Sequence, residues 1–269
     1  MLSNTSRWLT YVLAVLYAIL GLLLFFFSNQ LAPVFAWKVT PFMTMTIGGW
    51  CLGNAWLAWI TARRWHWSLV YSALIYLWLF GLGELLVLFN FRNKLVLAHP
   101  IAWLYLLTLI VNALAAVIGV LDWLRIRPRL ATGKTGFSAG QYVAITAFIL
   151  FVGFLGLYGS VAQIGAPGTN GGIFPEVMSL FTLRSFGMFY LTLALAVVPY
   201  LWNQNVEAIL HHGFAGYGLI VIITLAAFLN IGLFDFGAKP GGLLYFAAYL
   251  AVGVPLLFIF RRLGTGAPV

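Results

Sequence analysis

The stretch from Phe42 to Trp50 reads FMTMTIGGW and opens a long apolar segment. The stretch from Phe181 to Phe189, 139 positions further on, reads FTLRSFGMF and opens another. In both stretches Phe, a Thr or Ser, Gly and a final aromatic residue follow in the same order. We therefore predict that the chain consists of two tandem copies of one helical unit.

Further matches follow the first one along the chain. Three pairs of residues recur at spacings of 140 to 146 positions: Tyr105 and Tyr245, His66 and His212, and Tyr71 and Tyr217. The spacing changes where loops are expected, and loops tolerate insertions. The order of the matches strengthens the prediction of a repeat.

Composition places the protein in a membrane. Of the 269 residues, 63% are hydrophobic and only 7% are charged, and the mean hydropathy is +1.02. A soluble domain carries about 25% charged residues. So little charge cannot cover a surface that faces water, which makes lipid the solvent and leaves no soluble domain.

The hydropathy pattern predicts an all-α integral membrane protein with eight transmembrane helices. A helix needs about 20 apolar residues to cross a bilayer. The expected spans are residues 8–28, 43–62, 67–90, 101–123, 141–163, 180–202, 214–236 and 241–260.

These spans divide into two tandem four-helix repeats. We place the first repeat at residues 1–125, a basic linker at 126–140 and the second repeat at 141–269. Because four is an even number, both copies have the same orientation, which predicts a pseudo-two-fold axis along the membrane normal.

The distribution of Lys and Arg predicts the orientation. With eight spans, the side that carries both termini holds nine basic residues: Arg7, Arg63, Arg64, Arg125, Arg127, Arg129, Lys134, Arg261 and Arg262. The opposite side holds five: Lys38, Arg92, Lys94, Arg184 and Lys239. The positive-inside rule then places both termini in the cytoplasm, and we expect a bacterial inner (plasma) membrane. The net charge of +9 is thereby explained without a nucleic-acid partner.

Polar residues at membrane depth are the candidates for function, because each must find a partner or line a cavity. Glu84 is expected about 9 Å below one end of its span and Arg184 about 6 Å below the same end. Asn230 aligns with Glu84 in the repeat. We predict an ion pair between Glu84 and Arg184 across the two halves. It would be a binding site or a structural lock, unless Arg184 extends to the membrane surface.

Asn54 and Asn112 are expected near the middle of the membrane. An Asn there usually bonds to a neighbouring helix, so contact with a ligand is the alternative. Trp50, Trp56 and Trp78 also lie deep in their spans. They would pack between helices or line a pocket.

The sequence argues against metal and cofactor sites and against catalysis. All four histidines fall in or beside expected loops, whereas a haem in the bilayer needs an axial ligand at depth. The five acidic residues lie at different depths and form no paired-carboxylate or Ser-His-Asp arrangement. We expect no metal, no cofactor and no enzymatic activity.

Two functions remain. The first is a non-enzymatic scaffold or binding subunit of a membrane assembly, whose partners are lipid and other membrane subunits. The alternative is a small-molecule transporter with its site at the interface of the two repeats. Pro199 and Pro255 inside expected spans favour a transporter, while the scarcity of charge at depth favours a scaffold.

Overall fold

The computed structural model describes residues 1–130, 136–170 and 175–264. The side chains of residues 244 and 262–264 are not described. Lys134, which the charge count uses, and the middle of the expected linker lie outside the described residues. The described chain is built from α-helices and short 3₁₀ turns: α1 Asn4–Phe26, α2 Ser28–Leu31, η1 Ala32–Val34, α3 Pro41–Arg64, α4 Trp67–Asn90, η2 Arg92–Lys94, α5 Pro100–Ile126, α6 Ala139–Val161, α7 Leu180–Val197, η3 Val198–Leu201, α8 Val206–Leu229, η4 Ile231–Leu233 and α9 Gly241–Gly264.

Seven helices of the described chain are long and apolar enough to cross a membrane. They are α1, α4, α5, α6, α7 with η3, α8 and α9. This confirms an all-α, multi-pass membrane protein. The helix α3 is as long as α4 but is not one of the seven. It carries Thr, Gly and Asn residues along its length, and most of these are buried inside the protein.

Local sequence explains where the helices begin. Short polar side chains accept a hydrogen bond from the third backbone N–H that follows, which satisfies an otherwise unpaired helix N-terminus. Ser3, Thr40, Ser138, Ser179 and Asn205 cap five helices in this way. The helices α3 and α5 also begin with a proline, whose missing N–H costs nothing at that position.

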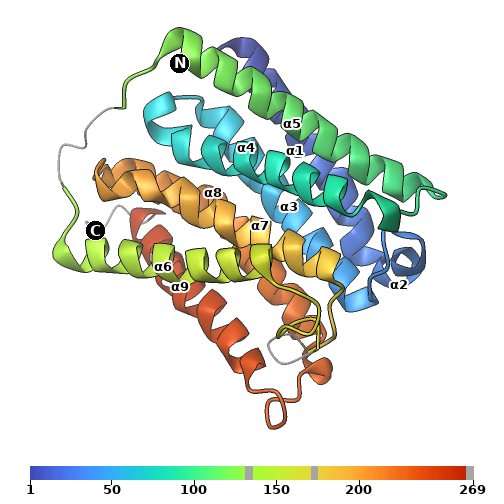
Figure 1. Ribbon diagram of the computed structural model, residues 1–269. Helices are drawn as coiled ribbons and strands as arrows, with labels where there is room; N and C mark the ends of the chain where they lie inside the picture. The colour runs from blue at the N-terminus through green and yellow to red at the C-terminus, as the bar shows by residue number, and fades with distance from the viewer. Residues whose placement is uncertain (131–135, 171–174, 265–269) are drawn as a thin grey trace.

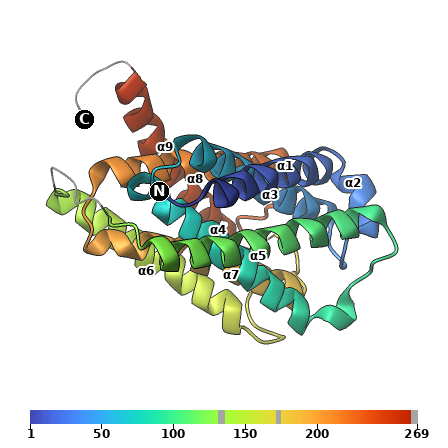
Figure 2. The same cartoon turned by 90° about the horizontal axis from the view of Figure 1, so that it is seen from above.

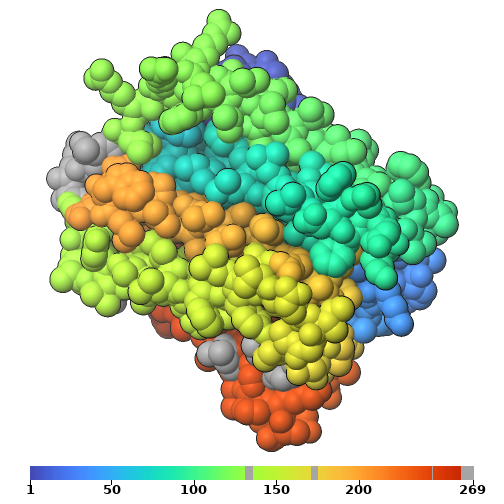
Figure 3. Space-filling view, viewed as in Figure 1, coloured from blue at the N-terminus to red at the C-terminus, as the bar shows by residue number. Residues whose placement is uncertain are grey.

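The long helices form two layers. Figures 1 and 2 show one layer in the order α5, α4, α7, α6 and the other in the order α1, α3, α8, α9. The contacts α1–α5, α3–α4 and α4–α8 join the layers. Figure 3 shows α4, α7 and α6 side by side on one face, with the segment that leads from α8 into α9 projecting below them.

The N-terminus and the end of α9 lie at one end of the molecule, toward the upper left in Figure 1. We call this end the terminal face. It also carries the α3–α4 and α7–α8 connections, the end of α5 and the start of α6, and the opposite end is the loop face.

The closest contact in the first half is between α1 and α3, and glycines make it possible. A Cβ atom added to Gly21 would lie 2.7 Å from the backbone nitrogen of Leu52. One added to Gly48 would lie 2.5 Å from the backbone nitrogen of Phe25. The two backbones therefore touch directly, as in small-residue packing of membrane helices.

The closest contact in the second half, between α6 and α7, has the same construction. A Cβ atom on Gly156 would lie 2.3 Å from the backbone nitrogen of Leu191. One on Gly187 would lie 2.3 Å from the backbone nitrogen of Ser160.

Candidate functional site

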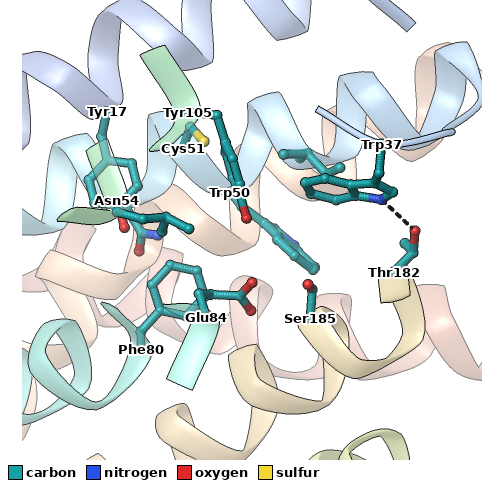
Figure 4. A pocket seen from close by; sticks show the side chains of 12 residues that line it. Tyr17, Trp37, Trp50, Cys51, Asn54, Phe80, Glu84, Tyr105, Thr182 and Ser185 are labelled. Atoms are coloured by element: carbon teal, nitrogen blue, oxygen red, sulfur yellow. Dashed lines mark hydrogen bonds between the residues drawn. The ribbon is translucent and has the colours of Figure 1, made fainter. Parts of the chain in front are cut away.

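A small cavity lies inside the bundle, on the loop-face side of its middle (Figure 4). Its volume is about 20 Å³, counted over positions open to the centre of a water-sized sphere. One water molecule needs about 10–15 Å³ on this measure. Twelve residues line it: Tyr17, Trp37, Ile47, Trp50, Cys51, Asn54, Phe80, Glu84, Tyr105, Leu109, Thr182 and Ser185. The last two belong to α7, so both halves of the chain contribute to the site.

The connection from α2 to α3 covers the cavity toward the loop face. Trp37 is buried, and its indole N–H donates to the Thr182 hydroxyl over 3.0 Å. Its ring stacks on Phe181 with a centroid distance of 4.3 Å and also contacts the edge of Tyr105. The connection is held in place because the backbone N–H of Val96 donates to the carbonyl of Ala36 over 2.8 Å.

Aromatic rings form the wall between the two halves. Trp50 on α3 stacks on Phe189 on α7, with centroids 4.6 Å apart and planes inclined by 10°. Trp50 also meets the edge of Phe186 at 4.3 Å. Beside this pair, Phe80 stacks on Tyr76, one turn earlier on α4. These rings form one side of the cavity, between α3, α4 and α7.

Two buried polar side chains around the cavity have nitrogen atoms without a hydrogen-bond partner, namely the indole N–H of Trp50 and the side-chain amide of Asn54. The Glu84 carboxyl and the Ser185 hydroxyl point toward each other in Figure 4 and interact, while the Oε1 atom of Glu84 has no partner. Since buried polar groups are almost always satisfied, these three unpaired atoms around one cavity indicate a place for water or for a bound polar molecule.

The predicted ion pair is wrong. Glu84 is 3% exposed and lies at the cavity, but Arg184, which the structure also describes, makes no ion pair with it, and its Nε atom has no hydrogen-bond partner. Consecutive residues of a helix point about 100° apart. Because Ser185 points into the cavity, its neighbour Arg184 points elsewhere.

The three predicted asparagines have different places. Asn54 lines the cavity, and its side-chain oxygen accepts from the Tyr76 hydroxyl over 2.8 Å. Asn112 lies one layer behind it and donates to the hydroxyl of Tyr17, which does line the cavity, over 2.8 Å. Asn230 is at the end of α8 and donates to the carbonyl of Ala226 over 2.9 Å. Asn112 therefore supports the cavity, while Asn230 closes a helix end.

The three tryptophans that were predicted to lie deep in their spans are also found in different environments. Trp50 lines the cavity. Trp56 donates to the Phe214 carbonyl at the lipid-facing surface, and Trp78 packs over Gly119. Sequence reasoning missed Trp37, which looked like part of a loop, and Ser185, although it belongs to the repeated stretch.

A second group of buried polar side chains lies near the terminal face, between α4, η3 and α8. The Tyr71 hydroxyl interacts with Tyr200 and Asn203, whereas the indole N–H of Trp67 and the Nδ1 atom of His212 have no hydrogen-bond partner. The rings of Tyr71 and Tyr200 are 5.3 Å apart. We call this group the terminal-face cluster.

No three His, Cys, Asp or Glu side chains of the described chain come close enough together to hold a metal ion. Comparison with known proteins finds no matching family model, no matching curated protein and no matching solved structure.

Proposed function

We propose that the protein is a non-enzymatic membrane transporter that binds a small polar solute in the cavity beside Glu84. The observation that carries the proposal is the set of unpaired polar atoms of Glu84, Trp50 and Asn54 around a buried, water-sized space. A scaffold gains nothing from such groups, because each costs about 1–3 kcal/mol when left unpaired. A binding site needs them free.

The proposed architecture is eight membrane crossings in two tandem repeats of parallel orientation. The packing order supports it. If α1, α3, α4 and α5 correspond to α6, α7, α8 and α9, then the close pair α1–α3 corresponds to α6–α7, and α4–α5 corresponds to α8–α9. The same correspondence relates the two contacts between the halves, because α3–α8 in one direction matches α7–α4 in the other.

The glycine contacts support the same correspondence residue by residue. Gly48 and Leu52 on α3 become Gly187 and Leu191 on α7 when 139 positions are added. Their partners on α1, Gly21 and Phe25, become Gly156 and Ser160 on α6 when 135 are added. Both backbone contacts thus recur with one fixed spacing for each helix.

The aromatic stack fits a pseudo-two-fold axis between α3 and α7. Trp50 and Phe189 are 139 positions apart and therefore occupy equivalent positions in the two repeats. They stack on each other, as equivalent residues do beside a two-fold axis. The cavity next to them is at the interface of the repeats, where transporters with parallel repeats bind their substrates.

In this proposal α3 is the eighth crossing. It runs beside α1 and α8, and its polar residues are mostly turned toward protein rather than lipid. We also propose a bacterial inner membrane with both termini in the cytoplasm, on the charge distribution given above.

Labelling of Cys51 tests the proposal. It is the single cysteine of the chain, it is buried and it lines the cavity. A transporter must open its site to water, so we expect a small water-soluble thiosulfonate to modify Cys51 in proteoliposomes, from one side at a time. A Cys51→Ser, Gly232→Cys variant, with its thiol in an exposed turn, provides the accessible reference. If the reference reacts fully while Cys51 stays unmodified for hours, the site does not open and the proposal fails.

One observation favours the scaffold function as a second candidate. The helix α9 packs mainly against α8, and large apolar side chains such as Leu243, Leu250 and Phe258 are exposed along it. A partner subunit would bind there. Native mass spectrometry after gentle extraction would then find that subunit at fixed stoichiometry. If the chain is found without a partner subunit, the scaffold function is excluded and the transporter function remains.

A further inference from the structure

We infer that the solute is a small ammonium-type cation, such as ammonium or methylammonium, held by Glu84 inside a cage of aromatic rings. This inference rests on the proposed function, because it names the chemical class that the cavity would bind.

The charges in and around the cavity point to a cation. The sequence contains five acidic residues, and the structure describes all of them. Glu84 is buried, whereas Asp122, Glu176, Glu207 and Asp235 lie near helix ends or in connections and are partly or fully exposed. No Lys, Arg or His lines the cavity. A carboxylate at membrane depth without a counter-ion is costly, and a bound cation would supply the missing charge.

The wall of the cavity also fits a cation. Rings from five residues line it: Tyr17, Trp37, Trp50, Phe80 and Tyr105. An aromatic ring attracts an ammonium group that lies over its face once water is removed. A carboxyl group in a cavity lined by aromatic rings can recognise an ammonium-type cation, whereas an ionised Glu84 would repel an anion.

The size of the cavity and the groups that line it favour ammonium. A space of about 20 Å³ suits an ion about as large as a water molecule. Ammonium has this size, and it can donate to the Glu84 carboxyl and the Ser185 hydroxyl. Potassium requires a shell of oxygen atoms in place of its hydration water, and the cavity is mostly ring carbon. The geometry therefore favours ammonium over alkali ions of similar size.

The repeat limits the chain to one such site. Asn230, which aligns with Glu84 at the predicted spacing of 146, carries no charge and lies at the end of α8, where it bonds to the carbonyl of Ala226 and the sulfur of Met45. The groove between α6, α7 and α9 is lined by apolar and tyrosine side chains without a carboxylate. We expect one cation for each chain.

Thermal unfolding of the purified full chain in detergent tests the inference. The probes are ammonium, methylammonium and tetramethylammonium chloride, with potassium chloride at equal ionic strength and with urea as a neutral solute. A ligand that binds only the folded state stabilises it in a saturable way. We expect ammonium and methylammonium to raise the unfolding temperature, and tetramethylammonium, potassium and urea not to raise it.

The variants place the effect at the cavity. Glu84→Gln should weaken apparent ammonium affinity about 30-fold or more, since loss of a buried charge partner costs at least about 2 kcal/mol. Glu207→Gln, which removes an exposed acid on α8, should leave the affinity unchanged. The size series on the wild-type chain needs no variant, so the test does not depend on Glu84→Gln folding.

The outcomes separate the inference from the proposed function. If ammonium gives no saturable shift, or gives one that Glu84→Gln retains, the inference is wrong. If urea stabilises the protein and ammonium does not, and Cys51 becomes accessible, the cavity still binds a polar solute. In that case only the chemical class of the solute is wrong. An inert Cys51 refutes the proposed function itself.

Discussion

Replacing Gly48 by alanine should destabilise the protein through the contact between α1 and α3. The new Cβ atom would lie 2.5 Å from the backbone nitrogen of Phe25, and ordinary contact begins at 3.4 Å. The obstructing atom belongs to a helix backbone, so no side chain can turn away. The two helices must separate by about 0.9 Å along this direction, and overpacking of this kind costs about 1–3 kcal/mol.

The assay is equilibrium unfolding in mixed micelles, followed by tryptophan fluorescence. Gly216→Ala is the matched control, because Gly216 also lies within a helix but nothing comes within 4 Å of the added Cβ. Alanine there should be neutral or should stabilise by up to about 1 kcal/mol, since it restricts the unfolded chain. We expect Gly48→Ala to lose about 2 kcal/mol relative to the wild type.

The glycine contact between α6 and α7 adds a second expectation. Gly187→Ala would place its Cβ atom 2.3 Å from the backbone nitrogen of Ser160, so it should cost as much as Gly48→Ala. The two sites share no contact, and the losses should add within about 0.5 kcal/mol in the double variant. If Gly48→Ala is no less stable than Gly216→Ala, α1 and α3 can move apart without cost, and their close contact does not stabilise the protein.

Three other predictions use the same unfolding assay. Trp37→Phe keeps an aromatic side chain but removes the five-membered ring of the indole with its hydrogen bond to Thr182, so it should cost at least about 0.5–1.5 kcal/mol. Trp103→Phe, which loses a hydrogen bond at the exposed surface, should cost less, and equal losses would contradict the role of Trp37 in closing the cavity. Asn112→Ala removes an interhelical hydrogen bond and should cost about 0.6–2 kcal/mol, and an unchanged stability would mean that this bond contributes nothing. Tyr200→Phe removes a buried hydroxyl that interacts with Ser72 and Tyr71, so it should cost about 0.5–1.5 kcal/mol; an unchanged stability would mean that these contacts contribute nothing.

Most helix positions could be predicted from sequence. The predicted span 67–90 coincides with α4, and residues 43–62 fall inside α3. Hydropathy and length give these limits because a segment in lipid must satisfy its own backbone. The prediction erred for α8, which begins at Val206 rather than near residue 214. Its first turns include His211 and His212, and these polar residues led sequence reasoning to extend the loop.

The site was predictable only in part. Glu84 and Asn54 could be found because a polar side chain at membrane depth stands out against an apolar sequence. Their neighbours could not be found, since the direction of a side chain depends on how the helices are rotated in the bundle. The same limitation explains the incorrect pairing of Glu84 with Arg184. Depth along the membrane follows from sequence position, but the side of the helix that faces a partner does not.

The glycine contacts have a mechanical consequence. Helices whose backbones interlock cannot slide past each other without first moving apart, so α1 with α3 and α6 with α7 should each move as one rigid body. Between these bodies lie flat rings, and the stacked pair Trp50 and Phe189 can slide or tilt at little cost. We expect any rocking of the two halves to pivot at this stack, in the middle of the membrane, rather than at a loop on either surface.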